Sequence, residues 1–204
     1  MQPPPPPSIE PASPRLAADE RRVRLSTIAQ EVSTCVKCDL AKSRTNTVFA
    51  RGNPDSELLF VGEGPGYNED LQGSPFVGQA GQLLDKMISA MGFNVDDVYI
   101  CNVVKCRPPE NRNPLPPEMD ACLPYLTEQL RAVSPRVIVA LGRVAGQGLG
   151  CFTPESKGWR GVWRTWDSIP VMPTYHPAFL LRSPQFKRQV WEDLQKVMTR
   201  LGKG

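Results

Sequence analysis

The chain has 204 residues, of which 40% are hydrophobic, and a formal net charge of +3 from 24 basic and 21 acidic side chains. This length suits one domain with a sizeable core plus a tail, and so small a charge does not by itself argue for nucleic acid. No run approaches the roughly 18 apolar residues of a membrane span, and the N-terminus has no apolar signal-peptide core. We therefore expect a cytoplasmic protein whose six cysteines are thiols or metal ligands rather than disulfides.

The composition divides the chain into a tail and a domain. Residues 1–20 are rich in proline, which favours extended chain over packed structure. We expect a mobile tail there and a single domain over residues 21–204. A short helix over residues 21–32 is expected to open the domain, because its apolar residues recur at helical spacing.

Four apolar runs predict buried strands, at residues 58–61, 98–104, 137–141 and 170–175. Further helices are predicted over residues 79–91, 116–133 and 185–201, with a short one near Val144. Strands that alternate with helices favour a mainly parallel sheet covered on both faces. The aromatic, basic segment 159–166 is expected to form a hairpin.

A glycine-rich stretch follows the first predicted strand. Gly62, Gly64 and Gly66 allow tight backbone conformations and close approach of a ligand, and open α/β sheets usually bind ligands at such turns. Neither the dinucleotide-binding fingerprint nor the phosphate-binding loop is present. The stretch is therefore either a simple turn or a pocket lined by backbone, with Phe76 presented by a loop as one wall.

Four cysteines are placed to share one metal centre: Cys35, Cys38, Cys106 and Cys122. The C-x-x-C spacing of the first two brings a pair of thiolates within reach of one centre. The spacing is compatible with tetrahedral zinc, with a four-cysteine iron–sulfur cluster, and with unrelated buried thiols.

Polar residues stand at predicted strand ends. Asn102 interrupts an apolar run, and its carboxamide either satisfies a backbone group or reads a heterocycle, since it both donates and accepts. His176, the single histidine, follows the last predicted strand and is either structural or functional. Glu63 and Glu69 flank the glycine turn, where carboxylates are often simply solvated. Their common location at carboxyl ends of strands favours a functional site.

Four motifs resemble those of the family 4, iron–sulfur-containing uracil-DNA glycosylases. They are GEGPGYNED at 62–70, GSPFVGQAGQLLD at 73–85, NVVKCRPPENRNP at 102–114 and HPAFLLR at 176–182. The resemblance runs from about Cys35 to the last helix. It implies a three-layer α/β/α sandwich around a short, mainly parallel, four-stranded sheet. It also implies a [4Fe–4S] cluster on Cys35, Cys38, Cys106 and Cys122 that orders DNA-contacting loops.

The resemblance also assigns roles in a uracil pocket. Phe76 would stack on a flipped uracil, and Asn102 would pair with its N3–H and O4. The Gly62–Gly64 turn and His176 would donate to O2 and stabilise the uracil anion. Recognition by this carboxamide would also reject cytosine, because cytosine has an acceptor at N3 and a donor at N4 where uracil has a donor and an acceptor.

The group that activates water is left open. Related family 1 enzymes carry an aspartate at the third position of the turn motif, which here is Gly64. Glu63 or Glu69 would orient the water, or Glu69 would instead fill the space that a thymine methyl needs. The residues do not decide between these roles.

A DNA-contacting rim is also implied. Leu180, Leu181 and Arg182 resemble a loop that inserts an apolar wedge into the base stack, although two leucines that cap the core are the alternative. The expected phosphate contacts are Lys105, Arg107, Arg112 and Arg182.

The predicted function is that of a monofunctional DNA glycosylase that removes uracil and initiates base excision repair. The alternatives are a non-catalytic DNA-binding module of the same fold, associated with replication or repair proteins, and an unrelated zinc protein. The expected partner is uracil-containing DNA, single- or double-stranded, with no membrane. We expect a nucleoid-associated monomer, and the tail is a candidate docking segment for a replication or repair protein, although no motif in it supports this.

Overall fold

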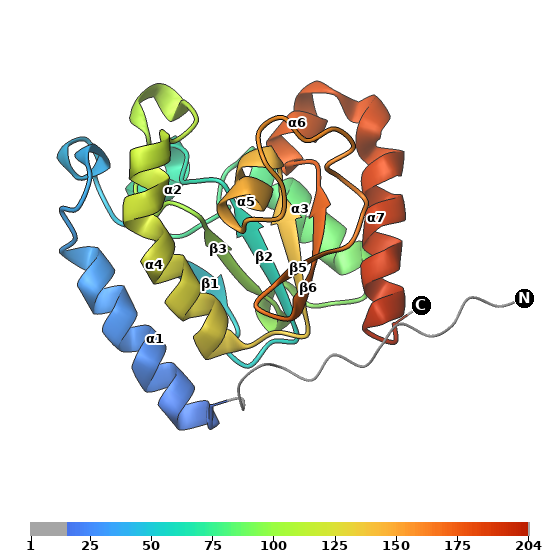
Figure 1. The fold of residues 1–204 in the computed structure, drawn as a ribbon, viewed down its shortest axis with the longest axis horizontal. Helices are drawn as coiled ribbons and strands as arrows, with labels where there is room; N and C mark the ends of the chain where they lie inside the picture. The colour runs from blue at the N-terminus through green and yellow to red at the C-terminus, as the bar shows by residue number, and fades with distance from the viewer. Residues whose placement is uncertain (1–15, 204) are drawn as a thin grey trace, which may run out of the picture.

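The computed structural model describes residues 16–203, so the tail expected over residues 1–20, with its expected docking partner, lies mostly outside the described residues. Helix α1 (Ala18–Ser33) begins before residue 21 and so takes in the last residues of the predicted tail (Figure 1). Within residues 16–203, no helix combines the length and the apolar character that a membrane crossing requires.

The described part of the chain forms one sheet of six strands in the order β1-β3-β2-β4-β6-β5. The four predicted strands are its parallel centre: β2 (Leu58–Gly62), β3 (Tyr99–Asn102), β4 (Val137–Leu141) and β6 (Ile169–Thr174). The predicted number of strands is wrong, because β1 (Ala50–Gly52) and β5 (Arg164–Trp166) pair antiparallel at the two edges. The hairpin expected within 159–166 instead joins β5 to β6, through the positive φ angles of Asp167 (44°) and Ser168 (68°).

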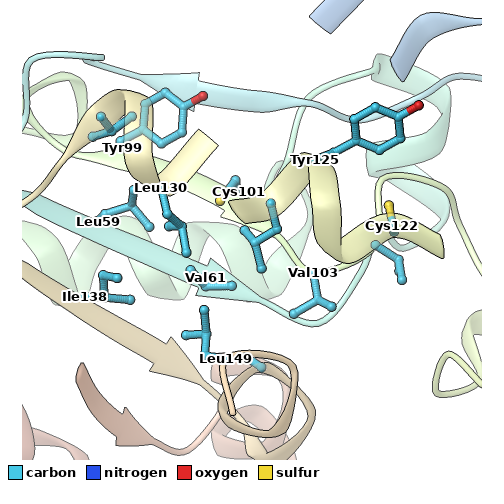
Figure 2. Packing of buried hydrophobic residues seen from close by; sticks show 14 of the residues in the cluster. Leu59, Val61, Tyr99, Cys101, Val103, Cys122, Tyr125, Leu130, Ile138 and Leu149 are labelled. Atoms are coloured by element: carbon cyan, nitrogen blue, oxygen red, sulfur yellow. The ribbon is translucent and has the colours of Figure 1, made fainter. Parts of the chain in front are cut away.

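Helices cover both faces of the sheet, which confirms the α/β/α sandwich (Figure 1). One face carries α1, α4 (Pro116–Val133) and α5 (Arg143–Gly148), and the other carries α3 (Gln79–Ala90), α6 (Pro177–Arg182) and α7 (Lys187–Arg200). A hydrophobic core lies on each face of the sheet, and alternate residues of each strand point into one core or the other. Leu59 and Val61 face the α4 side (Figure 2), whereas Leu58 and Phe60 face the α3 side. The remaining helices are short: α2 (Tyr67–Gln72) and the 3₁₀ helices Asp39–Lys42, Val95–Asp97, Pro109–Asn111 and Pro184–Phe186.

The parallel strands bring their carboxyl ends to one edge of the sheet. Gly62 of β2 lies opposite Asn102 of β3, and β3 ends there rather than at the predicted residue 104. The next two backbone amides, of Val103 and Val104, donate hydrogen bonds to the carbonyls of Gly62 (3.0 Å) and Glu63 (3.1 Å). Asn102 is therefore the last residue of its strand and faces the edge where ligands bind in such sheets.

A buried carboxylate fastens α7 to the sheet. Asp193 is 1% exposed, and its Oδ2 accepts hydrogen bonds from the Thr174 hydroxyl (2.7 Å) and the Arg160 guanidinium (3.0 Å). Burial raises the pKa of the Asp193 carboxyl, and the Thr174 and Arg160 contacts oppose that shift. This cluster joins β6, α7 and the segment before β5.

We expect Asp193→Ala to lower the free energy of unfolding by about 3 kcal/mol, because Thr174 and Arg160 both lose their acceptor in a buried place. Denaturant unfolding monitored by circular dichroism measures the change. The matched control is Glu192→Ala, one residue away on α7, whose half-exposed carboxylate pairs with Arg188 at 3.3 Å. That variant should lose about 0.5 kcal/mol or less. Equal losses in the two variants would contradict the role given to Asp193.

Candidate active site

A pocket of about 390 Å³ opens at the carboxyl edge of the sheet. Its walls come from the turn after β2, the loop before α4, and α6. The pocket brings together most of the residues predicted to recognise uracil or to catalyse its release: Glu63, Gly64, Glu69, Phe76, Asn102 and His176. The assembly of these residues agrees with the prediction, while their individual roles remain predictions.

Asn102 lines this pocket and carries an unsatisfied polar atom. The residue is 2% exposed, and its side-chain Oδ1 is buried without a hydrogen-bond partner in the described part of the chain. Buried polar atoms in folded proteins nearly always have a partner. A ligand that donates a hydrogen bond at this point would supply the missing one.

Phe76 is held in a backbone conformation that bulky residues rarely adopt, with φ at 56°. Its carbonyl packs against α3 at Gly81, where an added Cβ would lie 1.8 Å from that oxygen. Its ring stacks on the His176 ring, with centroids 5.5 Å apart and planes 28° apart. Phe76 and His176 therefore form one continuous aromatic wall of the pocket.

Both carboxylate oxygens of Glu69 accept hydrogen bonds from backbone amides, and Glu69 thereby braces the turn at Phe76. Its Oε1 accepts hydrogen bonds from the amides of Val77 and Gly78, both at 2.9 Å, and its Oε2 accepts one from the amide of Gly66 at 3.2 Å. The first two amides directly follow Phe76, so the Glu69 carboxylate fixes the strained turn that positions that ring. Its oxygens are thus used for structure, which sets it apart from Glu63.

Glu63 is the less constrained of the two carboxylates. Its side chain lines the pocket and makes no hydrogen bond with the described residues, although its backbone carbonyl accepts one from Val104. Burial raises the pKa of the Glu63 carboxyl above its ordinary value. A partly buried, unpaired carboxylate in a pocket has the properties of a general base.

His176 caps α6 and is fixed in one tautomer. Its Nδ1 accepts a hydrogen bond from the amide of Ala178 at 3.1 Å. An imidazole whose Nδ1 accepts carries its proton on Nε2 when neutral. Burial, helped by the positive charge of Arg182, lowers the pKa of His176 to about 4. At neutral pH the ring is therefore an uncharged donor through Nε2.

The predicted DNA rim is only partly at the surface. Leu181 is 44% exposed, and Arg182 is exposed beside the pocket, as expected. Arg107 packs over the Tyr67 ring at 5.0 Å and donates to Asn111 at 2.7 Å. These residues form a basic and apolar margin near the pocket.

Two residues of the predicted rim are buried, and a third is held in an ion pair. Leu180 is 1% exposed because the predicted wedge loop is the helix α6, which turns this residue into the core and leaves Leu181 outside. Lys105 is also 1% exposed, and its Nζ donates to the carbonyl of Asn102 at 2.6 Å, so it is not placed for a phosphate contact. Arg112 lines the pocket, but it is held by both oxygens of Glu118, at 2.7 and 2.8 Å.

The four cysteines predicted as ligands surround one small cavity, on the α4 side of the sheet. Cys106 and Cys122 are buried, and Figure 2 shows Cys122 on α4 near Val103. The Sγ of Cys106 accepts a hydrogen bond from Arg44 at 3.2 Å, and that of Cys122 accepts one from the Lys105 amide at 3.3 Å. N–H groups directed at sulfur suit thiolate ligands.

The four cysteines line one cavity, but their sulfurs do not converge on a single ion position in the described residues. Among residues 16–203, no three histidine, cysteine or acidic side chains are close enough to hold a single ion. Thiolates on one tetrahedral zinc lie about 2.3 Å from it and hence close to one another. A set of four cysteines is the donor set of both structural zinc sites and iron–sulfur clusters.

Sequence reasoning missed two residues that shape the cysteine cavity. Arg44, for which the sequence analysis proposes no role, donates to the Cys35 carbonyl (2.7 Å) as well as to Cys106. Asp70 is buried and holds the backbone beside Arg44 by accepting from the amides of Thr45 (2.9 Å) and Asn46 (3.2 Å). The acidic pair Glu69–Asp70 was the available signal for the second residue.

Comparisons with known proteins agree with the motifs. A family model described as the Uracil DNA glycosylase superfamily matches residues 49–195. The Type-4 uracil-DNA glycosylase of Archaeoglobus fulgidus is 44% identical over 187 residues, which cover 88% of this chain and 94% of the relative. The protein of the same name from Saccharolobus solfataricus is 46% identical over 182 residues, with coverage of 85% and 84%. The one from Thermotoga maritima is 44% identical over 183 residues, with coverage of 86% and 94%.

The family resemblance predicted from the sequence is thereby confirmed. Identity at this level extends over most of both chains, and the family model includes the strands that form the pocket. The chain belongs to the Type-4 uracil-DNA glycosylases of the uracil DNA glycosylase superfamily.

Proposed function

We propose that this protein hydrolyses the N-glycosidic bond of uracil in DNA, leaves an abasic site and so begins base excision repair. The family supports the reaction, since its members at 44–46% identity are named uracil-DNA glycosylases. The structural observation that carries the proposal is the buried, unpaired Oδ1 of Asn102 in a pocket large enough for a flipped nucleotide.

Recognition would use the two ends of the Asn102 amide. Its Oδ1 accepts from uracil N3–H and its Nδ2 donates to O4, whereas cytosine offers an acceptor and a donor at these two positions. The uracil ring would stack on Phe76, which the Glu69 brace holds in place. Rejection of cytosine follows, because its binding would leave both amide atoms unpaired in a buried site.

Bond cleavage leaves the electron pair of the glycosidic bond on uracil N1, and the negative charge spreads to O2. The Nε2–H of neutral His176 and the backbone at Gly64 line the pocket as donors for that oxygen. A water molecule oriented by Glu63 attacks C1′, and its proton passes to the carboxylate. No lysine lines this pocket within the described residues, so the abasic sugar would be released without strand cleavage.

The cysteine cavity would hold a [4Fe–4S] cluster through Cys35, Cys38, Cys106 and Cys122. When bound, such a cluster supplies four iron–thiolate bonds, which join segments that are distant in the sequence. The chain's own residues would complete the site through the N–H groups of Arg44 and Lys105 that already point at sulfur. The role proposed for the cluster is to hold the loop after β3 in place.

Base release from oligonucleotides that carry one uracil or one thymine tests the function. We expect cleavage after alkali at uracil alone. Asn102→Asp, which keeps the size but loses the Nδ2 donor, should slow it by about 10²–10³. Asp96→Asn, an exposed residue in the 3₁₀ helix Val95–Asp97, is the control. A chain that binds DNA and releases no base would instead be a non-catalytic module.

The pH dependence of single-turnover uracil release separates the roles of the two acids. Burial raises the pKa of Glu63, so activity should be present above that raised value and fall as the carboxylate takes up a proton. His176 should cause no change near pH 6.5, because its neutral form persists down to about pH 4. Glu63→Gln should be slow and lack the acidic fall, whereas Glu69→Gln should keep that fall and lose thermal stability. If neither variant slows release, catalysis rests on anion stabilisation alone.

Iron content tests the cysteine assignment. Protein purified without air should contain about four irons per chain and lose most of them in Cys122→Ala, because that thiol faces the shared cavity. The matched control is Cys151→Ala, a half-buried thiol outside the cavity, which should retain its iron. Zinc in place of iron, or equal loss in both variants, would contradict the assignment.

A further inference from the structure

Lys105 is a buried lysine in an uncommon setting. It is 1% exposed, and within the described residues its Nζ has a backbone carbonyl rather than a carboxylate as its partner. The aromatic ring of Phe49 lies 5.9 Å from the same nitrogen. Lysines are almost never fully buried unless they are paired, so this position calls for a specific purpose.

Three contacts of Lys105 connect three separate segments. Its Nζ donates to the carbonyl of Asn102 at 2.6 Å, and its amide donates to the Sγ of Cys122 on α4 at 3.3 Å. Its own carbonyl accepts from the amide of Val48 at 2.8 Å. One residue therefore touches both the end of β3 and the wall of the cysteine cavity, which it helps to line.

The hydrogen bond from Lys105 to the Asn102 carbonyl can fix the direction in which the Asn102 side chain projects. The amides of Val103 and Val104 are bound to the turn after β2, so the chain bends sharply after Asn102. The Lys105 side chain folds back over this bend to the Asn102 carbonyl. A buried carbonyl needs a donor, and loss of this one would loosen the backbone from which the Asn102 carboxamide projects.

We propose that Lys105 is a positioning residue that couples the base-reading Asn102 to the cysteine site. The inference rests on the proposed function and on the proposed cluster. Lys105 touches neither base nor sugar, and acts by holding the Asn102 backbone while its own backbone is held by Cys122. The cysteine site is thereby joined to base recognition through a single residue.

Coupling of this kind is reciprocal. If a filled cysteine site helps to hold Asn102, then a base bound to Asn102 must help to retain what the cysteines hold. Uracil in the pocket should therefore slow the loss of iron, and DNA without uracil should not. This consequence can be measured on the unaltered protein.

The first experiment uses DNA that carries 2′-fluoro-deoxyuridine, whose glycosidic bond resists cleavage, beside the same DNA with thymine. Lys105→Met keeps the linear chain and removes the donor. We expect it to retain iron and its affinity for thymine DNA, and to lose on the order of tenfold in preference for the uracil analogue. Lys86→Met, an exposed lysine on α3, is the control and should match the unaltered chain.

A double-variant cycle tests whether Lys105 acts through Asn102. Asn102→Ala should abolish most of the preference for the uracil analogue, and adding Lys105→Met to it should cost nothing further. Losses that multiply in the double variant would overturn the proposal, as would an unchanged preference in Lys105→Met that retains iron.

The second experiment follows iron release to a chelator and remains decisive if Lys105→Met does not fold. In the unaltered chain, the uracil-analogue DNA should slow iron release several-fold relative to thymine DNA. Equal release rates would overturn the coupling. Cleavage of ordinary uracil DNA by the same preparation reports separately on the proposed function, so failure of one is not mistaken for failure of the other.

Discussion

The absence of a side chain at Gly62 is the constraint on which the pocket depends. Strands β2 and β3 pair in parallel with Gly62 opposite Asn102, and neighbouring strands lie only about 4.8 Å apart. A Cβ at Gly62 would stand 2.3 Å from Oδ1 of Asn102 and 2.6 Å from Cζ of Phe76. The amide and the ring can therefore converge on one space only because this position carries no side chain.

The same space is kept open by groups that do not touch a ligand. The left-handed backbone of Phe76 is unfavourable on its own, and two features outweigh that cost: the close packing allowed by Gly81 and the three amides bound by Glu69. Arg112, which also lines the pocket, is held by both oxygens of Glu118. The pocket is thus largely formed before DNA arrives, which reduces the ordering that binding would otherwise require.

The sequence predicts the centre of this fold better than its margins. Four apolar runs identify the parallel strands, and the rule that ligands bind at their carboxyl ends places Asn102 and His176 together. The edge strands β1 and β5 have three residues each, too few for a periodic pattern to emerge.

The burial of Lys105 and Leu180 could not be predicted for a different reason. Lys105 stands in a proline-rich loop next to arginines, a composition typical of surfaces, and its burial depends on the distant residues Phe49 and Cys122. Helix α6 has six residues, so its sequence alone does not show which of two adjacent leucines faces the core. Side-chain direction in both cases is set by tertiary contacts.

Glu63 and Glu69 show how the local environment can distinguish two residues for which the sequence proposes the same role. Glu63 and Glu69 are chemically alike and close in the chain, yet three amides occupy Glu69 and none in the described chain occupies Glu63. The oxygens of Glu69 are occupied by backbone donors, whereas burial without a partner raises the pKa of the Glu63 carboxyl. The neutral state of His176 suits the other proposed role, because its Nδ1 accepts from the backbone and its Nε2–H is left as a donor for the uracil anion. In the proposed mechanism, burial and hydrogen bonding thus divide proton acceptance and anion stabilisation between Glu63 and His176.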